Sequence, residues 1–151
     1  LEGFKLNNGA AAFVDYAHTP DALSNVLTTL RELAPRRLHC VFGCGGDRDT
    51  TKRPAMGKIA AELADEVTVT SDNPRSESPE AIISEIVSGI PENSSKVNIE
   101  PDRRTAIIQA VKKALAGDII LVAGKGHENY QEIAGVKHPF DDRQVISEFL
   151  K

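Results

Sequence analysis

The sequence has few cysteines and no long hydrophobic run, and these absences exclude several classes of protein. Cys40 and Cys44 are the only cysteines in 151 residues, too few for a disulfide framework or, by themselves, for a zinc site. We expect Cys40 to behave as a small buried hydrophobic residue and Cys44 as a loop thiol. No apolar run approaches about 20 residues, so no membrane-spanning segment is expected. No charged-then-apolar leader is present, which is typical of a cytoplasmic protein.

An excess of positive charge is also missing. The formal net charge is -4, which argues against nucleic acid as the main partner. The proportions of hydrophobic and charged residues, 40% and 26%, are those of an ordinary globular protein, and the length suits one domain over residues 1–151. The chain begins at Leu1 and not at Met, so we expect a fragment or a processed chain.

Short apolar runs alternate with helical patterns along the chain. The expected strands cover residues 10–16, 37–43, 66–71, 96–100 and 119–123, and the expected helices cover 20–34, 52–65, 79–89, 102–115 and 141–151. In the fourth helix, Ile107, Ile108, Val111 and Leu115 are expected on the buried side. Residues 131–140 predict a hairpin around Gly135. The fold class is therefore α/β: a Rossmann-like three-layer domain with a mostly parallel sheet of about six strands, helices on both faces and a small C-terminal hairpin.

Three polar loops follow predicted strands, at residues 43–49, 72–75 and 124–128. In a parallel sheet these strand ends meet at one edge, where ligands bind, so the loops should converge. They carry two cations, two anions and an amide: Arg48, Arg75, Asp72, Glu128 and Asn73. This mixture suits a zwitterion, because an arginine can hold a carboxylate with two hydrogen bonds while a carboxylate accepts from an ammonium.

Each loop also has a simpler interpretation. The turn at residues 72–75 could be capped by its own Asp and Asn side chains, with Pro74 stiffening it. Arg48 with Asp49, or Arg75 with Glu77, could form surface ion pairs of little energetic consequence. Taken singly, the loops favour these interpretations, whereas three strand ends together favour a binding site.

The glycine loop and the histidines are less informative. Residues 43–49 match neither the dinucleotide fingerprint nor a Walker A loop, so nucleotide binding by this loop alone is a weak hypothesis. His18 could cap local backbone groups, or it could contact a nucleotide while Asp15 holds a ribose hydroxyl. His39, on a predicted strand, is interpreted as a partly buried histidine with a satisfied hydrogen bond, and His127 is intermediate.

Four motifs carry a resemblance to a known family: residues 14–20 (VDYAHTP), 42–49 (FGCGGDRD), 72–75 (DNPR) and 123–128 (AGKGHE). In this order and spacing they resemble the C-terminal domain of the Mur ligases, and most closely the type that adds diaminopimelate. The resemblance runs from about Phe13 to the last helix. It implies an ATP-dependent ligase of peptidoglycan synthesis, in which an acyl phosphate on the muropeptide is attacked by the amine of the incoming amino acid.

The resemblance also implies roles for individual residues. Arg75 would hold the distal carboxylate of meso-diaminopimelate, and Asp72 and Asn73 would position its polar end groups. The rest of the substrate site would be Pro74 within the motif, with Arg48, Gly124 and Glu128. Asp15 and His18 would face ATP. Enzymes that add L-lysine lack the arginine, so Arg75 points to diaminopimelate.

The family's phosphate loop, metal ligands and uridine-nucleotide domain have no counterpart in this sequence. The resemblance therefore implies that ATP and Mg²⁺ are held by a central domain and the UDP-linked muropeptide by an N-terminal domain, neither of which is present here. We expect the chain to fold alone as a monomer, without catalytic residues or metal ligands of its own and without ligase activity. Two alternatives are a folylpolyglutamate synthetase-like C-terminal domain and a stand-alone α/β module that binds an anionic metabolite.

Overall fold

A six-stranded sheet forms the centre of the molecule, with strand order β1-β2-β6-β3-β4-β5. In this computed structural model, which describes residues 1–94 and 96–151, β1 pairs antiparallel with β2 and the remaining neighbours are parallel. The strands are β1 (Glu2–Lys5), β2 (Ala11–Asp15), β3 (Leu38–Phe42), β4 (Glu66–Val69), β5 (Lys96–Ile99) and β6 (Ile119–Ala123). A separate hairpin consists of β7 (Tyr130–Ile133) and β8 (Val136–Pro139).

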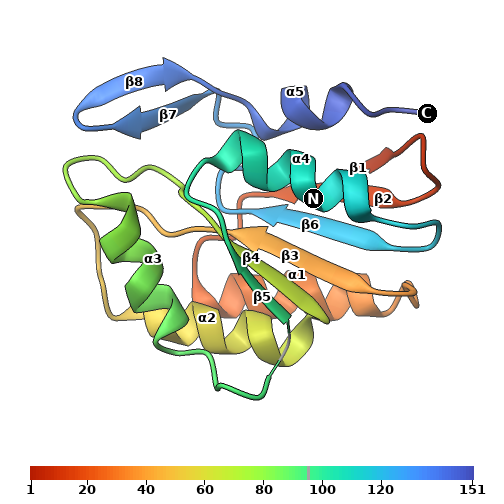
Figure 1. Ribbon diagram of the computed structural model, residues 1–151, viewed down its shortest axis with the longest axis horizontal. Helices are drawn as coiled ribbons and strands as arrows, with labels where there is room; N and C mark the ends of the chain where they lie inside the picture. The colour runs from red at the N-terminus through yellow and green to blue at the C-terminus, as the bar shows by residue number, and fades with distance from the viewer. Residues whose placement is uncertain (95) are drawn as a thin grey trace.

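Helices cover both faces of the sheet (Figure 1). One face carries α1 (Pro20–Arg31), α2 (Lys52–Leu63) and α3 (Pro79–Val87), and the other carries α4 (Arg103–Lys113) and α5 (Asp142–Ser147). The hairpin lies beyond the sheet, next to α5 in the chain. The predicted three-layer α/β fold with a mostly parallel sheet is confirmed. Among the described residues, no helix has the length and apolar character needed to cross a membrane.

Alternation along the central strands supplies two hydrophobic cores. On β3, Cys40 and Phe42 belong to the core under α1, α2 and α3, whereas Val41 belongs to the core under α4 and α5. All five residues of β3 and of β6 are buried, as a sheet covered on both faces requires. Cys44 is buried too and its thiol lies 3.7 Å from the Met56 sulfur, so it is a core residue and not an accessible loop thiol.

Helix starts follow the sequence signals closely, and helix ends do so less well. The Thr19 and Ser78 side chains each accept a hydrogen bond from the backbone of the first turn, with proline next in the chain. The fourth helix ends at Lys113 and the backbone of Ala114 is extended, which leaves Leu115 58% exposed; its predicted burial was wrong.

The remaining differences concern the edges of the fold. The first helix ends at Arg31, before the expected residue 34, and the last ends at Ser147, before residue 151. Strand β1 was missed because Glu2–Lys5 has no apolar run; it pairs along the free edge of β2.

A buried ion pair ties the second helical layer to the strand ends. Arg103, at the start of α4, makes two 2.8 Å contacts with Asp142 at the start of α5, and both side chains are fully buried. The same guanidinium donates to the carbonyl oxygens of Ser71 at 2.9 Å and Ala123 at 3.2 Å. The ends of β4 and β6 are thereby held at one point.

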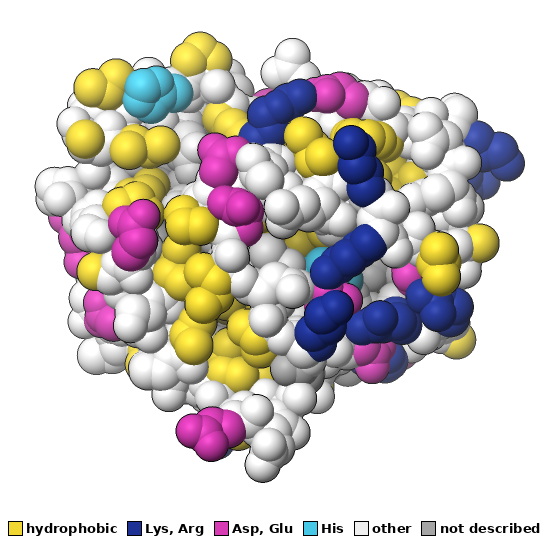
Figure 2. Space-filling view, viewed as in Figure 1, with side chains coloured by type: hydrophobic (Ala, Val, Ile, Leu, Met, Phe, Trp, Pro, Cys, Tyr) yellow, Lys and Arg dark blue, Asp and Glu magenta, His cyan; other side chains and the backbone are white. Residues whose placement is uncertain are grey.

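Basic side chains gather at the opposite, amino end of the sheet, on the right of the face shown in Figure 2. Three of them are paired with carboxylates: Arg36 with Asp118, and both Arg37 and Lys113 with Glu66. His39 lies among them, with Nε2 2.7 Å from the Thr68 hydroxyl. Its predicted burial with a satisfied hydrogen bond is confirmed, and burial lowers the pKa of His39 to about 4, although Glu66 acts in the other direction.

This environment predicts a pH dependence of stability. Because the native state disfavours protonation of His39, the stability contributed by the neutral side chain is present above pH 6.5 and lost as the pH falls toward 4. Between pH 7 and pH 5 the free energy of unfolding should fall by about 2 kcal/mol more in wild type than in His39→Gln. Urea unfolding at both pH values measures this, with exposed His138→Gln as the control. Parallel pH dependence in wild type and His39→Gln would contradict it.

The buried ion pair predicts a strong asymmetry between single and double variants. Asp142→Asn leaves the Arg103 guanidinium buried without its anion, which should cost about 3–5 kcal/mol of unfolding free energy. Arg103→Met combined with Asp142→Leu should recover most of that loss. Exposed Arg104→Met, which removes the surface pair with Glu148, should cost no more than about 1 kcal/mol in the same urea experiment. A single variant as stable as wild type would show that the pair is dispensable.

Candidate functional site

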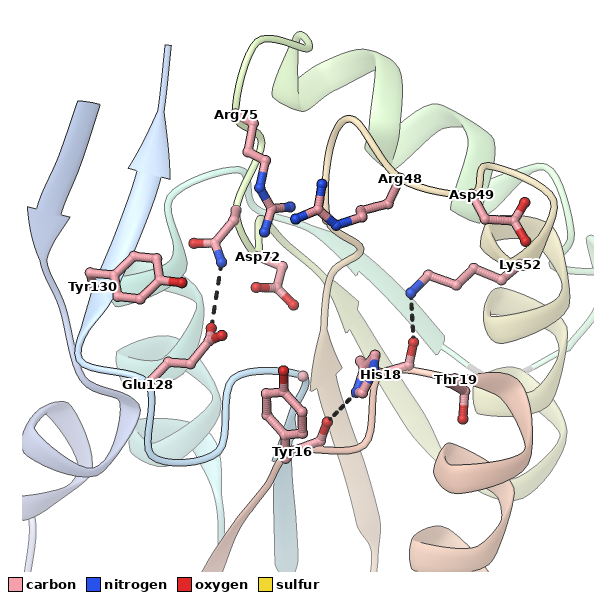
Figure 3. A pocket seen from close by; sticks show the side chains of 13 residues that line it. Tyr16, His18, Thr19, Arg48, Asp49, Lys52, Asp72, Arg75, Glu128 and Tyr130 are labelled. Carbon is pink, nitrogen blue, oxygen red and sulfur yellow. Dashed lines mark hydrogen bonds between the residues drawn. The ribbon is translucent and has the colours of Figure 1, made fainter. Parts of the chain in front are cut away.

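The three polar loops converge at the carboxyl ends of the parallel strands, as predicted. They enclose a cavity of about 540 Å³ (Figure 3). Its lining residues are Tyr16, His18, Thr19, Gly45, Arg48, Asp49, Lys52, Asp72, Asn73, Arg75, Gly124, Glu128 and Tyr130. Six of the predicted substrate-site residues lie here, and Pro74 lies between two of them in the chain without lining the cavity.

The glycine loop after β3 packs against the loop after β4. The backbone N–H of Gly46 donates to the Asn73 carbonyl at 2.7 Å, and a β-carbon on Gly46 would lie 1.8 Å from the Pro74 carbonyl oxygen. A β-carbon on Gly43 would lie 2.2 Å from the Thr70 oxygen. Glycine is therefore needed here so that two backbones can approach closely, and not to surround a phosphate.

Arg75 is held in an uncommon backbone conformation at the mouth of the cavity. Its φ is +54°, in the left-handed region, and its backbone bonds with Glu132 and Ala134 join the turn to the hairpin. The guanidinium donates to the Gly46 carbonyl at 2.9 Å and lies 3.8 Å from a Glu132 carboxylate oxygen. Arg75 is thus oriented from both sides, and its outer edge faces the cavity.

Arg48 approaches the same space from the glycine loop. Figure 3 shows the Arg48 and Arg75 guanidiniums pointing toward one another. Two cations that face each other across an open cavity favour an anion between them. Within the described chain, the surface pairs considered from the sequence are replaced by others: Glu77 pairs with Arg53, and Asp49 accepts from Thr51.

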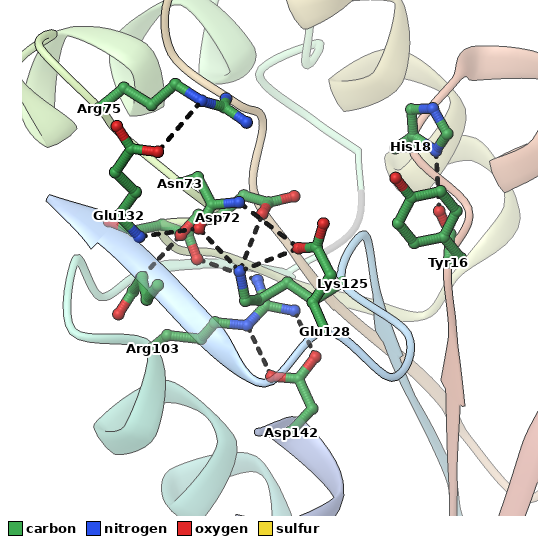
Figure 4. A network of polar contacts seen from close by, with 12 residues as sticks. Tyr16, His18, Asp72, Asn73, Arg75, Arg103, Lys125, Glu128, Glu132 and Asp142 are labelled. Atoms are coloured by element: carbon green, nitrogen blue, oxygen red, sulfur yellow. Dashed lines mark hydrogen bonds and ion pairs between the residues drawn. The ribbon is translucent and has the colours of Figure 1, made fainter. Parts of the chain in front are cut away.

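The sequence reasoning missed a buried lysine. It lies behind the wall of the cavity that Asp72, Asn73 and Glu128 form. The Lys125 ammonium is 2.8 Å from Asn73 Oδ1, 3.2 Å from Glu128 Oε1 and 3.5 Å from Asp72 Oδ1 (Figure 4). Its side chain is 0% exposed. A signal was available, because only Gly124 separates Lys125 from the fully buried strand β6.

Gly124 permits the close contact between this loop and Asp72. Its φ is +116°, and a β-carbon there would lie 2.7 Å from the Asp72 Oδ2 atom. The role expected for Gly124 is therefore one of space and backbone conformation, because it has no side chain that could bind a ligand.

The two residues expected to face a nucleotide are placed differently. His18 is exposed, lines the cavity, and has Nδ1 2.9 Å from the Tyr16 carbonyl oxygen. Asp15 does not line the cavity, and its carboxylate accepts from the Ala17 backbone at 2.9 Å. Lys52 was missed by the sequence reasoning: it lines the cavity and donates to the His18 carbonyl at 2.7 Å.

The chemistry of the cavity is that of binding. Burial raises the pKa of Cys44 to about 12, so the thiol beneath the glycine loop stays protonated and unreactive. Among the described residues, no group of three or more His, Cys, Asp or Glu side chains is arranged to hold a metal ion. What remains is a pair of guanidiniums facing a wall with two carboxylates and an amide, an arrangement that suits a zwitterion.

Comparison with known proteins identifies the family of this chain. Residues 1–126 match the family described as Mur ligase, glutamate ligase domain. The UDP-N-acetylmuramoyl-L-alanyl-D-glutamate–2,6-diaminopimelate ligase of Syntrophomonas wolfei is 56% identical over 93% of this chain, and that of Clostridioides difficile is 47% identical over 99%. The chain spans only 29% and 34% of these two relatives.

Solved structures of related enzymes share the fold of this chain. A structure of a UDP-N-acetylmuramoyl-L-alanyl-D-glutamate–2,6-diaminopimelate ligase matches with a TM-score of 0.90 and 49% identity, over 94% of this chain and 29% of its own. A bifunctional folylpolyglutamate synthase/dihydrofolate synthase from Yersinia pestis shares the fold at a TM-score of 0.59 and 22% identity, over 76% of this chain and 25% of its own. The predicted resemblance is confirmed, and the chain belongs to the Mur ligase family as its C-terminal, glutamate ligase domain.

Proposed function

We propose that this domain binds the incoming amino acid, meso-diaminopimelate, for an ATP-dependent ligase of peptidoglycan synthesis. The observation that carries the proposal is the single cavity in which Arg48 and Arg75 face Asp72, Asn73 and Glu128. Relatives named as diaminopimelate ligases at about half sequence identity support the same assignment.

The substrate's groups match this division of charge. Arg75, oriented by Gly46 and Glu132, would hold the distal carboxylate, with Arg48 adding a second cation from the facing loop. Asp72 and Glu128 would accept hydrogen bonds from an ammonium of the substrate. The reacting amine would then point out of the cavity, toward the muropeptide carboxyl group.

Selectivity against L-lysine follows from Arg75. Lysine lacks the second carboxylate, so binding it would leave a partly buried guanidinium without its anion. A site built to hydrogen-bond a substrate group rejects an analogue that lacks the group far more strongly than an apolar pocket rejects a missing methylene.

The remaining machinery belongs to domains outside this sequence. Since the chain spans about 29% of its relatives, central and N-terminal domains would hold ATP, Mg²⁺ and the UDP-linked muropeptide. When bound there, ATP supplies the phosphate that activates the muropeptide carboxylate. In this domain His18 would lie toward the nucleotide, and Asp15 would act on it only indirectly, by ordering the turn at Ala17.

An amide-resolved NMR titration of this chain tests whether selectivity resides in the domain. We expect saturable shifts confined to residues 48, 72–75 and 124–128 with meso-diaminopimelate, and much weaker ones with L-lysine or L-glutamate. We also expect no ligation by the isolated chain when ATP and muropeptide are supplied. Equal shifts with lysine would contradict the role of Arg75, and a response to glutamate alone would favour a folylpolyglutamate synthetase-like activity.

Replacing Arg75 in the full-length ligase tests the carboxylate contact directly. Arg75→Ala should raise KM for meso-diaminopimelate roughly 10- to 100-fold, the range for losing a hydrogen bond to a charged group. KM for ATP should change little, and discrimination against L-lysine should shrink. Exposed Arg104→Ala, on α4 and outside the cavity, is the control for loss of one positive charge. An unchanged KM for meso-diaminopimelate would exclude the contact.

A further inference from the structure

Lys125 is a cation that contacts the residues of the site from behind and does not line the cavity. Its ammonium is fully buried, and Lys125 is absent from the cavity lining although its three polar contacts, Asp72, Asn73 and Glu128, all belong to that lining. A buried ammonium is unfavourable unless its protons are all accepted. Here the acceptors come from the loop after β4 and from its own loop, so the lysine joins the two loops from behind.

The contact with Asn73 determines which way its amide faces. Asn73 Oδ1 accepts from Lys125 at 2.8 Å and from the Glu132 backbone N–H at 3.0 Å, so its acceptor capacity is used. The Nδ2 group lies 3.4 Å from Glu128 Oε1, on the side of the cavity. Asn73 is therefore presented to a ligand as a donor.

The contact with the two carboxylates places one positive charge between two negative ones. Asp72 and Glu128 both lie within 3.5 Å of the same ammonium, and without it two like charges would share a partly buried wall. One cation between two anions leaves a net charge of about -1, which suits one incoming ammonium.

Other charged groups also face this wall, and they are already paired or stand across the cavity. Helices α4 and α5 contribute the Arg103–Asp142 pair, and the hairpin contributes Tyr130 and Glu132. The loops and α2 contribute the remaining groups: Arg48, Asp49, Arg75, Lys52 and His18. Lys125 is closer to both carboxylates than any other cation for which a contact is recorded in the described chain.

We infer that Lys125 is a positioning residue: its ammonium holds Asp72 and Glu128 in place for the substrate ammonium, and it turns Asn73 into a hydrogen-bond donor. This inference rests on the proposed function, since it assigns the wall to an amino-acid ammonium. A merely structural lysine would hold the loops without affecting how the site responds to pH.

The test is the KM for the amino acid in the full-length ligase between pH 6.5 and pH 9, expressed as the ratio of variant to wild type. In Lys125→Met the two carboxylates would have no cation between them, so one of them should take up a proton more readily and stop accepting from the substrate ammonium. The ratio should be roughly tenfold or more at pH 7 and fall toward unity as the pH rises. The altered charge concerns the acceptors for the amino-acid ammonium, so KM for ATP and for the muropeptide should stay within about twofold of wild type.

Two further variants and one control separate charge from shape. Lys125→Arg retains the cation, so its KM ratio to wild type should not depend on pH, even if that ratio is above one. Lys125→Met with Glu128→Gln removes the repulsion, so this protein should melt closer to wild type than the single variant and also give a flat ratio. Lys137→Met is the matched control. The Lys125 and Lys137 ammoniums lie 5.5 Å and 4.7 Å from the centre of the Tyr130 ring, but Lys137 is exposed and has no recorded contact with either carboxylate in the described chain.

The outcomes distinguish this inference from the proposed function. A flat ratio for Lys125→Met, or an equal rise in KM for all three substrates, overturns the inference. If Lys125→Met does not fold, the double variant decides by its stability: a folded double variant shows that repulsion between the carboxylates caused the loss and supports the inference, and an unfolded one overturns it. Should the wild-type ligase prefer L-lysine, the proposed substrate is wrong, yet the ratio can still be measured with lysine because its ammonium is the same group.

Discussion

The Arg103 guanidinium makes the contact on which the rest of the site depends. It binds Asp142 on α5 while donating to the carbonyl oxygens of Ser71 and Ala123, which are the last residues before Asp72 and Gly124. One planar cation thus determines the separation of two strand ends and secures two helices to them. The backbone from which the site residues project is positioned before any of them meets a ligand.

A buried cation also lies beneath the glycine loop and beneath the turn at residues 72–75. Arg53, in α2, reaches the Gly45 carbonyl and pairs with Glu77 and Glu85 beneath the glycine loop. Lys125 lies beneath the turn at residues 72–75. Buried ion pairs add little stability over well-packed apolar residues, but breaking one is costly. Here they join the three loops to the helices and to one another.

A fixed arrangement of the loops would matter for the proposed zwitterionic ligand. Its charged ends are separated by a fixed number of bonds, so the cationic and anionic walls must stay at a matching distance. Arg75 faces Arg48 across the mouth, while Asp72 and Glu128 form the opposite wall. The hairpin completes the enclosure, because the backbone of Arg75 bonds to Glu132 and Ala134, and Gln131 donates to the Asp72 carbonyl. The residues of the proposed ligand site therefore also make contacts that hold the fold together.

Much of the protein was determined by local sequence. The order of strands and helices follows from apolar runs and caps such as Thr19 and Ser78, because these depend on residues within one turn of the chain. The grouping of Arg48, Asp72, Arg75 and Glu128 at one edge follows from the rule for parallel sheets. Weaker local signals failed: β1 has no apolar run, and the extended backbone at Ala114 exposes Leu115.

Only the tertiary structure decided which charges are buried and which line the cavity. Lys125 and Arg75 are both cations in polar loops after buried strands, yet one is enclosed behind the wall and the other lines the cavity. The difference comes from contacts across more than 50 residues of chain, such as Lys125 with Asn73 and Arg75 with the hairpin. Burial is a property of surroundings assembled from distant segments, so the residue type and its immediate neighbours do not specify it.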